Sequence, residues 1–309
     1  MKTGWRCLLV VTGLVGCDGG LESTDRATTH VSALTSALAP DADTFINSMV
    51  PDNNNGTSPS IYTGVTGQGG MLRGLVRFAI PAALQGHITV SRVSLTMVTR
   101  GLSMTDMKPP RPATESLQAI TVDWSEGAGF GDGPTTNTIG QACGTTGATW
   151  NQPNCAGGTD WAGGAVAAAV SATASVPMAV EATVTWDSAD SGNAGLVTDV
   201  QSWIDAPAGN HGWRMTSSTG TAGDAQRFYA REAAGMGPGL TITYECNAGD
   251  TCGDQSDAGT DAPAADAGGP GTDGGGCSCA LADASGRPRA GLFVVAVAAV
   301  GVGRRRRRR

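Results

Sequence analysis

Residues 90–97 read Val-Ser-Arg-Val-Ser-Leu-Thr-Met, and this short segment decides the fold class. Side chains on a β-strand alternate between two faces, so Val93, Leu95 and Met97 lie together on one face. The same period of two recurs in 180–186 and in 240–244, and clusters of Gly, Pro, Asn and Asp separate such segments. The pattern predicts an all-β, antiparallel β-sandwich.

Weaker signals fill in the rest of the sandwich. Further strands are expected at 43–49, 72–80, 117–122, 213–216 and 227–231. One segment differs, because Leu196, Val200 and Trp203 recur at helical spacing before Pro207 ends the run. We therefore expect one folded domain over 41–245, with a single short helix that caps the end of the sandwich.

The composition agrees with a loop-rich β domain and restricts the partners. The chain has 46 glycines, and Lys2 and Lys108 are its only lysines. Its net charge is −7, but ten of its 20 basic residues lie in 1–16 and 280–309, together with one acidic residue, Asp283. The middle therefore keeps ten basic and 26 acidic residues, a balance of −16. Such an acidic surface argues against nucleic acid and against anionic lipid as partners.

The N-terminal residues have the features of an export signal. Lys2 and Arg6 precede the apolar run 7–14, which is too short to span a membrane, and Leu-Val-Gly-Cys ends at Cys17. This pattern predicts a signal peptide over 1–16. The last four residues resemble the bacterial lipobox, whose cysteine thiol receives a diacylglyceryl group, so Cys17 is the expected lipidation site. The alternative is an ordinary signal peptide that contains Cys17.

The C-terminal residues combine three features of a sorting tail. Cys277 and Cys279 are followed by the apolar run 290–303 and by six arginines at 304–309. The run would form a helix of about 21 Å, shorter than the ~30 Å hydrocarbon core. The whole segment 277–309 resembles the MYXO-CTERM tail, which implies processing near the two cysteines. A plain membrane anchor is the alternative, and either reading places the exported chain on the bacterial outer membrane or cell surface.

Two polar segments and four cysteines complete this layout. Residues 17–40 are expected to form a flexible stalk, and 246–276 a disordered linker rich in Asp, Ala and Gly. In an exported chain, the remaining cysteines are expected to pair as Cys143–Cys155 and Cys246–Cys252. Metal ligation is the alternative, although neither pair has a histidine nearby.

The middle region resembles the DNRLRE domain family, which overlaps β-sandwich carbohydrate-binding modules. The resemblance covers nearly all of 41–245. It is carried by Ala-Asp-Thr-Phe-Ile (42–46), the Asn turn (53–56), Gly-Leu-Val-Arg-Phe-Ala-Ile-Pro (74–81), the strand at 93–97, Val-Asp-Trp-Ser-Glu-Gly (122–127), Thr-Trp (149–150), Trp-Ala-Gly-Gly (161–164), the helix with Asn-His-Gly-Trp (210–213) and Arg-Phe-Tyr-Ala-Arg-Glu (227–232). It implies a jelly-roll-like β-sandwich that binds acidic or neutral polysaccharide.

Two groups of residues are candidates for that binding. Trp150, Trp161 and Trp213 lie in or beside loops and could stack on sugar rings, with core packing as the alternative. Arg227, Tyr229 and Arg231 would share one face of a strand, with Phe228 and Ala230 pointing inward. Arginine can hold a uronate carboxylate in a bidentate fork. The alternative for Arg231 is a structural ion pair with Glu126 or Glu232.

Metal binding and catalysis have little support in the sequence. Asp41, Asp43 and Asn53 offer oxygen ligands for a structural calcium ion, but no EF-hand spacing is present. No other cofactor is expected. His87 and His211 have no nucleophile nearby in the sequence, and Asp123 with Glu126 is a poor candidate for a glycosidase pair because the two are three residues apart.

The sequence thus leads to three hypotheses. The first is a non-catalytic surface protein that displays a polysaccharide-binding sandwich. The second is a structural or adhesive envelope protein that binds another protein. The third is a polysaccharide-degrading enzyme.

Overall fold

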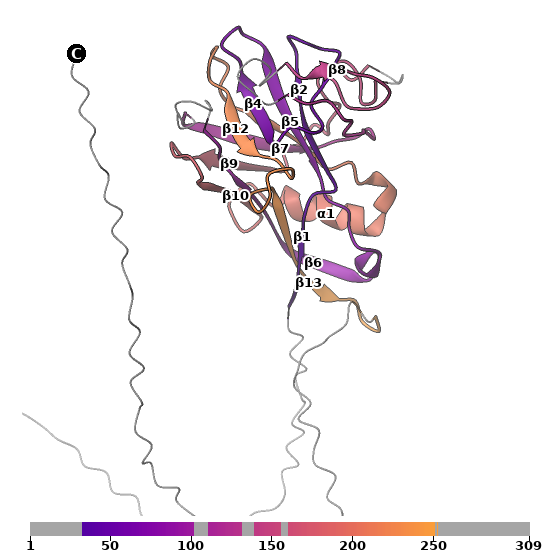
Figure 1. Ribbon diagram of the computed structural model, residues 1–309. Coiled ribbons are helices and arrows are strands. Elements are labelled where there is room, and N and C mark those ends of the chain that lie inside the picture. The colour runs from indigo at the N-terminus through magenta and orange to yellow at the C-terminus, as the bar shows by residue number, and fades with distance from the viewer. Residues whose placement is uncertain (1–32, 102–110, 132–138, 156–159, 251, 253–309) are drawn as a thin grey trace, which may run out of the picture. The chain divides into compact units, whose positions relative to one another are not determined.

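A computed structural model describes residues 33–101, 111–131, 139–155, 160–250 and 252 (Figure 1). The expected signal peptide with Cys17 and the expected tail with Cys277 and Cys279 lie outside the described residues. Among the residues described, no helix is both long and apolar enough to cross a membrane.

Two antiparallel sheets build the domain, as the period-two segments predict. The smaller sheet has the order β1 (Leu34–Leu38), β13 (Gly239–Cys246), β6 (Ile88–Val98) and β10 (Thr183–Asp187). The larger sheet has the order β12 (Gln226–Tyr229), β4 (Ser60–Val65), β5 (Met71–Arg77), β11 (Trp213–Ser217), β7 (Ala113–Ala119) and β9 (Ala172–Val176). β2 (Ala42–Asn47) also pairs with β5, and two short strands, β3 (Asn53–Asn54) and β8 (Gln141–Ala142), pair with each other. The predicted all-β sandwich is confirmed.

The main core lies between the sheets, and β6 shows why. Val93, Leu95 and Met97 are fully buried, whereas the residues between them are exposed or partly buried. They pack with Trp186 of β10, whose indole N–H donates to the carbonyl of Glu115 at 3.0 Å. Burying the indole removes a large apolar area from water, and this hydrogen bond satisfies its one polar group.

Within the described residues one α-helix, α1 (Gly195–Asp205), packs beside the smaller sheet, as predicted (Figure 1). It buries Leu196, Val200, Trp203 and Ile204. Two short 3-10 turns, η1 (Ala82–Leu84) and η2 (Pro207–Gly209), lie near it in the chain, and η2 begins at the proline expected to end the helix.

The predicted domain limits are wrong at both ends. β1 pairs in register with β13, from Leu34 opposite Tyr244 to Leu38 opposite Leu240, so residues 34–38 belong to the sheet and not to a flexible stalk. At the other end β13 reaches Cys246, and Cys252 is buried against the core. The folded region therefore begins before residue 41 and ends after residue 245.

A second, smaller core lies on the outer face of the larger sheet. Leu75 and Ile46 project from this face and contact Trp124 and Trp161, which come from the long loop after β7. The expected strand at 117–122 is displaced, because β7 ends at Ala119 and the chain then continues into this loop. The loop thus covers part of this outer face, and some of its residues belong to the sites described below.

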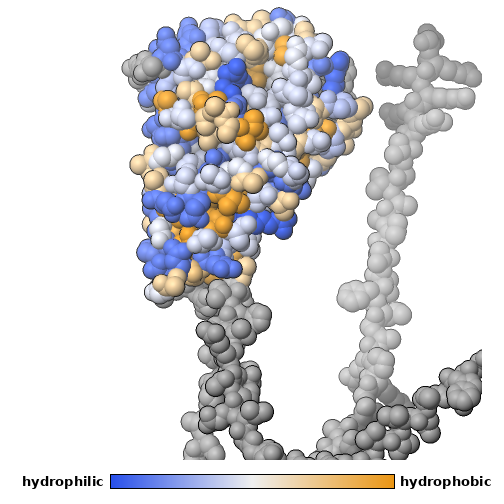
Figure 2. Space-filling view, turned by 180° about the vertical axis from the view of Figure 1, so that it is seen from behind, coloured by the Kyte–Doolittle hydropathy of each residue, from blue (hydrophilic) through white to orange (hydrophobic). Residues whose placement is uncertain are grey.

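The surface opposite the view of Figure 1 mixes hydrophilic and hydrophobic residues (Figure 2). Its apolar patches are small and are separated by polar ones. Small scattered patches of this kind are normal on protein surfaces.

Candidate functional site

The structure places two of the three candidate tryptophans in the interior. Trp213 is completely buried, and its N–H donates to Asp199 Oδ2 at 2.8 Å. Trp161 is 6% exposed, and its N–H donates to the carbonyl of Thr149 at 2.9 Å. A ring that is enclosed and hydrogen-bonded in this way cannot stack on a sugar, so the prediction of a binding role is wrong for Trp161 and Trp213.

Trp150 differs from them because it is only half-buried. It packs at the edge of the second core, and the guanidinium of Arg73 lies over its ring, 4.6 Å from the centroid. It is the one candidate tryptophan that stays in contact with solvent.

The predicted face of Arg227, Tyr229 and Arg231 does not exist as a binding surface. Arg227 is 2% exposed, donates to Ser60 Oγ and to the Gly101 carbonyl, and lies over the ring of Tyr62. Strand alternation predicted that this side of β12 would face solvent, but residues 99–101 pair along β12 through the bridge between Thr99 and Phe228, and Gly101 accepts a hydrogen bond from the Arg227 side chain. The inward positions of Phe228 and Ala230 are confirmed.

The other two members of that group are partly buried and engaged. Tyr229 is half-buried under the guanidinium of Arg100, which lies 5.2 Å from the ring centroid. Arg231 donates to both carboxylate oxygens of Glu126 and lies 3.2 Å from Glu232. For Arg231, the ion-pair alternative is the correct one.

Two arginines that the sequence analysis did not single out lie together on the outer face of the larger sheet. Arg73 is on β5, two residues from Leu75, and Arg214 on β11 is directly opposite Leu75, so all three project from the same face. Gln118 of β7 is the other neighbour of Arg214 and accepts a hydrogen bond from it at 2.7 Å. We call Arg73, Arg214, Gln118 and Trp150 the arginine face.

Hydrogen bonds to the backbone fix these two guanidinium groups. Arg73 donates to the carbonyl of Gly163, and Arg214 donates to the carbonyl of Gly164 at 2.7 Å. Both glycines have positive φ angles, and a Cβ at Gly163 would lie 2.5 Å from Arg73 Nη1, so this turn needs glycine to approach the arginines so closely.

The charge of the arginine face is not neutralised. Within the described part of the chain, neither Arg73 nor Arg214 has a carboxylate in ion-pair contact. Burial, with a smaller contribution from the charge of Arg73, lowers the pKa of Arg214 to about 10. Other arginines of the domain do have such partners: Arg77 with Asp41 and Asp123, Arg92 with Asp187, Arg111 with Asp224, and Arg231 with Glu126 and Glu232.

An open groove adjoins the arginine face. It has a volume of about 270 Å³ and runs between the ends of β4, β5 and β11. Arg73 forms part of its wall, together with Met71, Thr216 and Ser217. The wall of the groove is thus partly polar and partly apolar, and it is continuous with the arginine face at Arg73.

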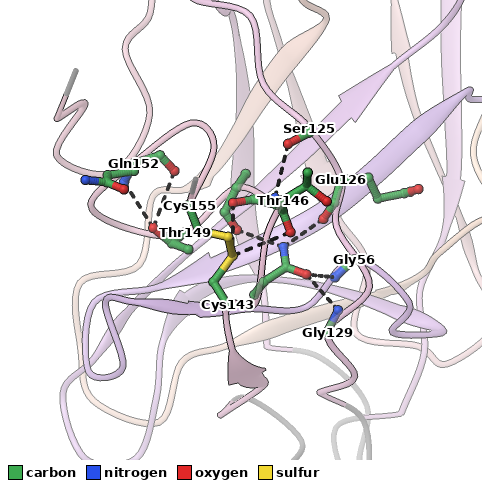
Figure 3. The surroundings of a disulfide bond; sticks show 12 residues. Gly56, Ser125, Glu126, Gly129, Cys143, Thr146, Thr149, Gln152 and Cys155 are labelled. Carbon is green, nitrogen blue, oxygen red and sulfur yellow. Dashed lines mark hydrogen bonds between the residues drawn. A yellow bond between two sulfur atoms is a disulfide. The ribbon is translucent and has the colours of Figure 1, made fainter. Parts of the chain in front are cut away.

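The long loop that carries Trp150 is held by the disulfide bond Cys143–Cys155 (Figure 3) and by the side chain of Asn54. The amide nitrogen of Asn54 donates to the carbonyls of Glu126 and Ala148, and its oxygen accepts from the N–H groups of Gly56 and Gly129. A buried side chain that uses all of these positions is a structural anchor. Asn54 therefore fixes this loop through its side-chain amide.

Both predicted disulfides are confirmed. Cys143 and Cys155 close the loop beside Asn54, with their Cα atoms 5.9 Å apart. Cys246 and Cys252 join the end of β13 to the residues after it, with their Cα atoms 5.7 Å apart.

The expected calcium ligands are not brought together. Asp41 accepts a hydrogen bond from Arg77, and the side-chain amide of Asn53 donates to the carbonyl of Ile139. Asp43 instead lies beside Glu126 and Glu232, with one carboxylate oxygen of each within 4.8 Å of the others. We call these three residues the acidic triad. Each belongs to one of the segments that carry the family resemblance, which is the signal that would have pointed to them.

Asp123 and Glu126 are engaged with different arginines. The side chain of Asp123 is 79% exposed and lies beside Arg77, whereas Glu126 is held by Arg231.

Comparison with known proteins adds no assignment. No protein-family model matches the chain. No curated protein matches its sequence either. The likeness to DNRLRE domains and to MYXO-CTERM tails therefore stays a prediction.

Proposed function

We propose that the protein is a non-catalytic, surface-displayed module that binds an acidic polysaccharide through the arginine face. The observation that carries the proposal is the pair Arg73 and Arg214, which are two adjacent cations without a carboxylate partner among the described residues of an acidic domain. By contrast, Arg77, Arg92, Arg111 and Arg231 each have a carboxylate partner. An anionic ligand would supply the missing counter-charge.

The chemistry of the arginine face suits a uronate. Arginine has five N–H donors, and Arg73 uses one of them in its hydrogen bond to Gly163, so the rest of its fork can meet a carboxylate. The pKa of Arg214 is lowered by burial and by the neighbouring charge, which means that its charged form is destabilised where it stands. A bound carboxylate would relieve that repulsion. Trp150 beside it offers an apolar surface to the sugar ring.

The layout of the domain suits display on a surface. β1 and β13 lie side by side, and the end of β13 pairs with the start of β1, so the described domain begins and finishes at the same end. In Figure 1, β2, β4 and β8 lie at the opposite end. If the lipobox and the sorting tail both function, they would tether the domain by that one end and present the larger sheet away from the membrane.

Binding to defined polysaccharides tests the proposal. Calorimetry would compare a polyuronate with a neutral polymer such as dextran, using the wild-type protein, Arg73→Gln and the matched control Arg92→Gln. Arg92 is an exposed arginine of the smaller sheet that pairs with Asp187, so its substitution makes the same change in charge at another place. We expect binding of the polyuronate only, and at least tenfold weaker binding by Arg73→Gln, since a charge-assisted hydrogen bond contributes about 1.5–3 kcal/mol.

Two results would refute the proposal. One is equal loss of affinity in Arg73→Gln and Arg92→Gln, which would mean that only net charge matters. The other is a folded protein that binds no polyanion. Capture of a protein partner that added uronate does not displace would instead support a structural or adhesive role.

A further inference from the structure

The acidic triad gathers three carboxylates from distant parts of the chain. Asp43 lies on β2, Glu126 in the loop after β7 and Glu232 just after β12. One carboxylate oxygen of each lies within 4.8 Å of the other two. Like charges so close repel one another, so all three can be ionised together only if a positive charge nearby offsets that repulsion.

Arg231 supplies only part of this charge. Its guanidinium group binds both oxygens of Glu126 and lies 3.2 Å from Glu232. Its backbone N–H donates to Asp43 Oδ2 at 2.9 Å. With all three acids ionised, the group of four residues keeps a net charge of −2.

Asp43 gives a second and independent indication of a ligand. The residue is 1% exposed, and its Oδ1 atom has no hydrogen-bond partner in the described part of the chain. Buried polar atoms nearly always have a partner, and leaving one without it costs about 1–3 kcal/mol. The free oxygen belongs to the same carboxylate that lies within reach of Glu126 and Glu232.

We propose that the acidic triad binds a divalent cation of the calcium type, with Asp43, Glu126 and Glu232 as its protein ligands. Calcium binds oxygen ligands at 2.3–2.6 Å, so ligands on opposite sides of the ion lie about 5 Å apart, which agrees with the spacing of the triad. All three ligands are hard oxygens, which disfavours zinc or copper. The +2 charge of the ion balances the net charge of −2 that the ionised triad and Arg231 have together.

The triad is accessible to solvent on one side. The side chains of Glu126 and Glu232 are 15% and 24% exposed, so water can reach the triad from their side and complete the coordination shell. A bound ion would join β2, the end of β12 and the long loop that carries Trp150. It would therefore stabilise the fold without contact with the arginine face, and this inference does not depend on the proposed function.

Calcium titration of the full-length protein tests the inference. After treatment with EDTA, the protein would be titrated with calcium chloride, with magnesium chloride in parallel, while the melting temperature and the heat of binding are measured. We expect a saturable rise in melting temperature with calcium, following the dependence of stability on ligand concentration. Glu232→Gln should bind calcium at least tenfold more weakly, whereas the control Glu245→Gln, an exposed carboxylate on β13, should bind as the wild type does.

In the rival explanation, Asp43 is simply protonated and needs no ion. Asn has the shape of a protonated Asp, so under the proposal Asp43→Asn loses calcium binding, whereas under the rival it leaves the protein unchanged. Under the rival explanation, the wild-type protein shows no bound calcium and no rise in melting temperature, and either result overturns the proposal. If Asp43→Asn does not fold, Glu232→Gln still decides the matter, because Glu232 is at the rim of the triad. Unchanged calcium binding in Glu232→Gln would also overturn it.

Discussion

Replacing Glu115 by glutamine should make the stability of the domain less dependent on pH. Glu115 lies on β7, is completely buried and accepts a hydrogen bond from Thr63 Oγ1 at 2.9 Å. Burial raises the pKa of its carboxyl to about 8, and hydrogen bonds from Thr63 and Ser217 offset only part of that effect. Near neutral pH the folded protein therefore keeps a proton on Glu115 that the unfolded chain has released.

The size of the effect follows from the two pKa values. In the unfolded chain the carboxyl titrates near 4.5, and in the folded protein near 8. Between these values the folded state binds more protons than the unfolded chain. The contribution of Glu115 to stability is therefore fully present below about pH 4.5 and is lost as the pH rises towards 8. Each pKa unit is worth about 1.4 kcal/mol, so the free energy of unfolding should fall by about 5 kcal/mol across this window through Glu115 alone.

Urea unfolding at a series of pH values from 5 to 9 measures this effect. Burial also raises the pKa of Asp43 to about 8, so the comparison must be the difference between wild type and Glu115→Gln at each pH. We expect the variant to become more stable relative to the wild type as the pH rises, and Glu245→Gln, which changes an exposed carboxylate, to follow the wild type. Parallel pH curves for Glu115→Gln and the wild type would refute the reasoning.

Four further variants test the packing. Asn54→Ala removes four hydrogen bonds to buried backbone groups and should lower the free energy of unfolding by about 3 kcal/mol or more in urea. Replacing both Cys143 and Cys155 by serine opens a loop with a sequence separation of 12 and should lower it by about 3 kcal/mol, with no effect of reductant on the variant. Trp186→Ala should cost about 3–5 kcal/mol by calorimetry, whereas Trp150→Ala should cost less because that ring is half-exposed.

The sequence predicts those parts of the fold in which one face of an element is buried. β6, β10 and β13 alternate, and α1 has a helical apolar stripe, so each carries its own signal. β4 has no such signal, because all six of its residues are buried and apolar side chains do not alternate with polar ones. β1 was missed for another reason: its sequence, Leu-Thr-Ser-Ala-Leu, becomes a strand through pairing with β13, about two hundred residues further along the chain.

The candidate sites were harder to predict because they depend on what lies nearby in space. A tryptophan beside a loop looks the same in sequence whether its ring is exposed or buried. In the structure the N–H of Trp213 donates to Asp199. The arginine face has no sequence signal, since the distinguishing property of Arg73 and Arg214 is the absence of a carboxylate among their described neighbours. That property exists only after folding.

The acidic character of the domain and the proposed binding of a polyanion are compatible. At physiological salt, charges more than about 8 Å apart are largely screened, so a bound uronate responds to its immediate neighbours and not to the overall balance of −16. On the arginine face those neighbours include two guanidinium groups, a neutral amide and an indole ring. If the proposal holds, acidic residues on other parts of the domain would oppose binding there and so favour this face for a polyanion.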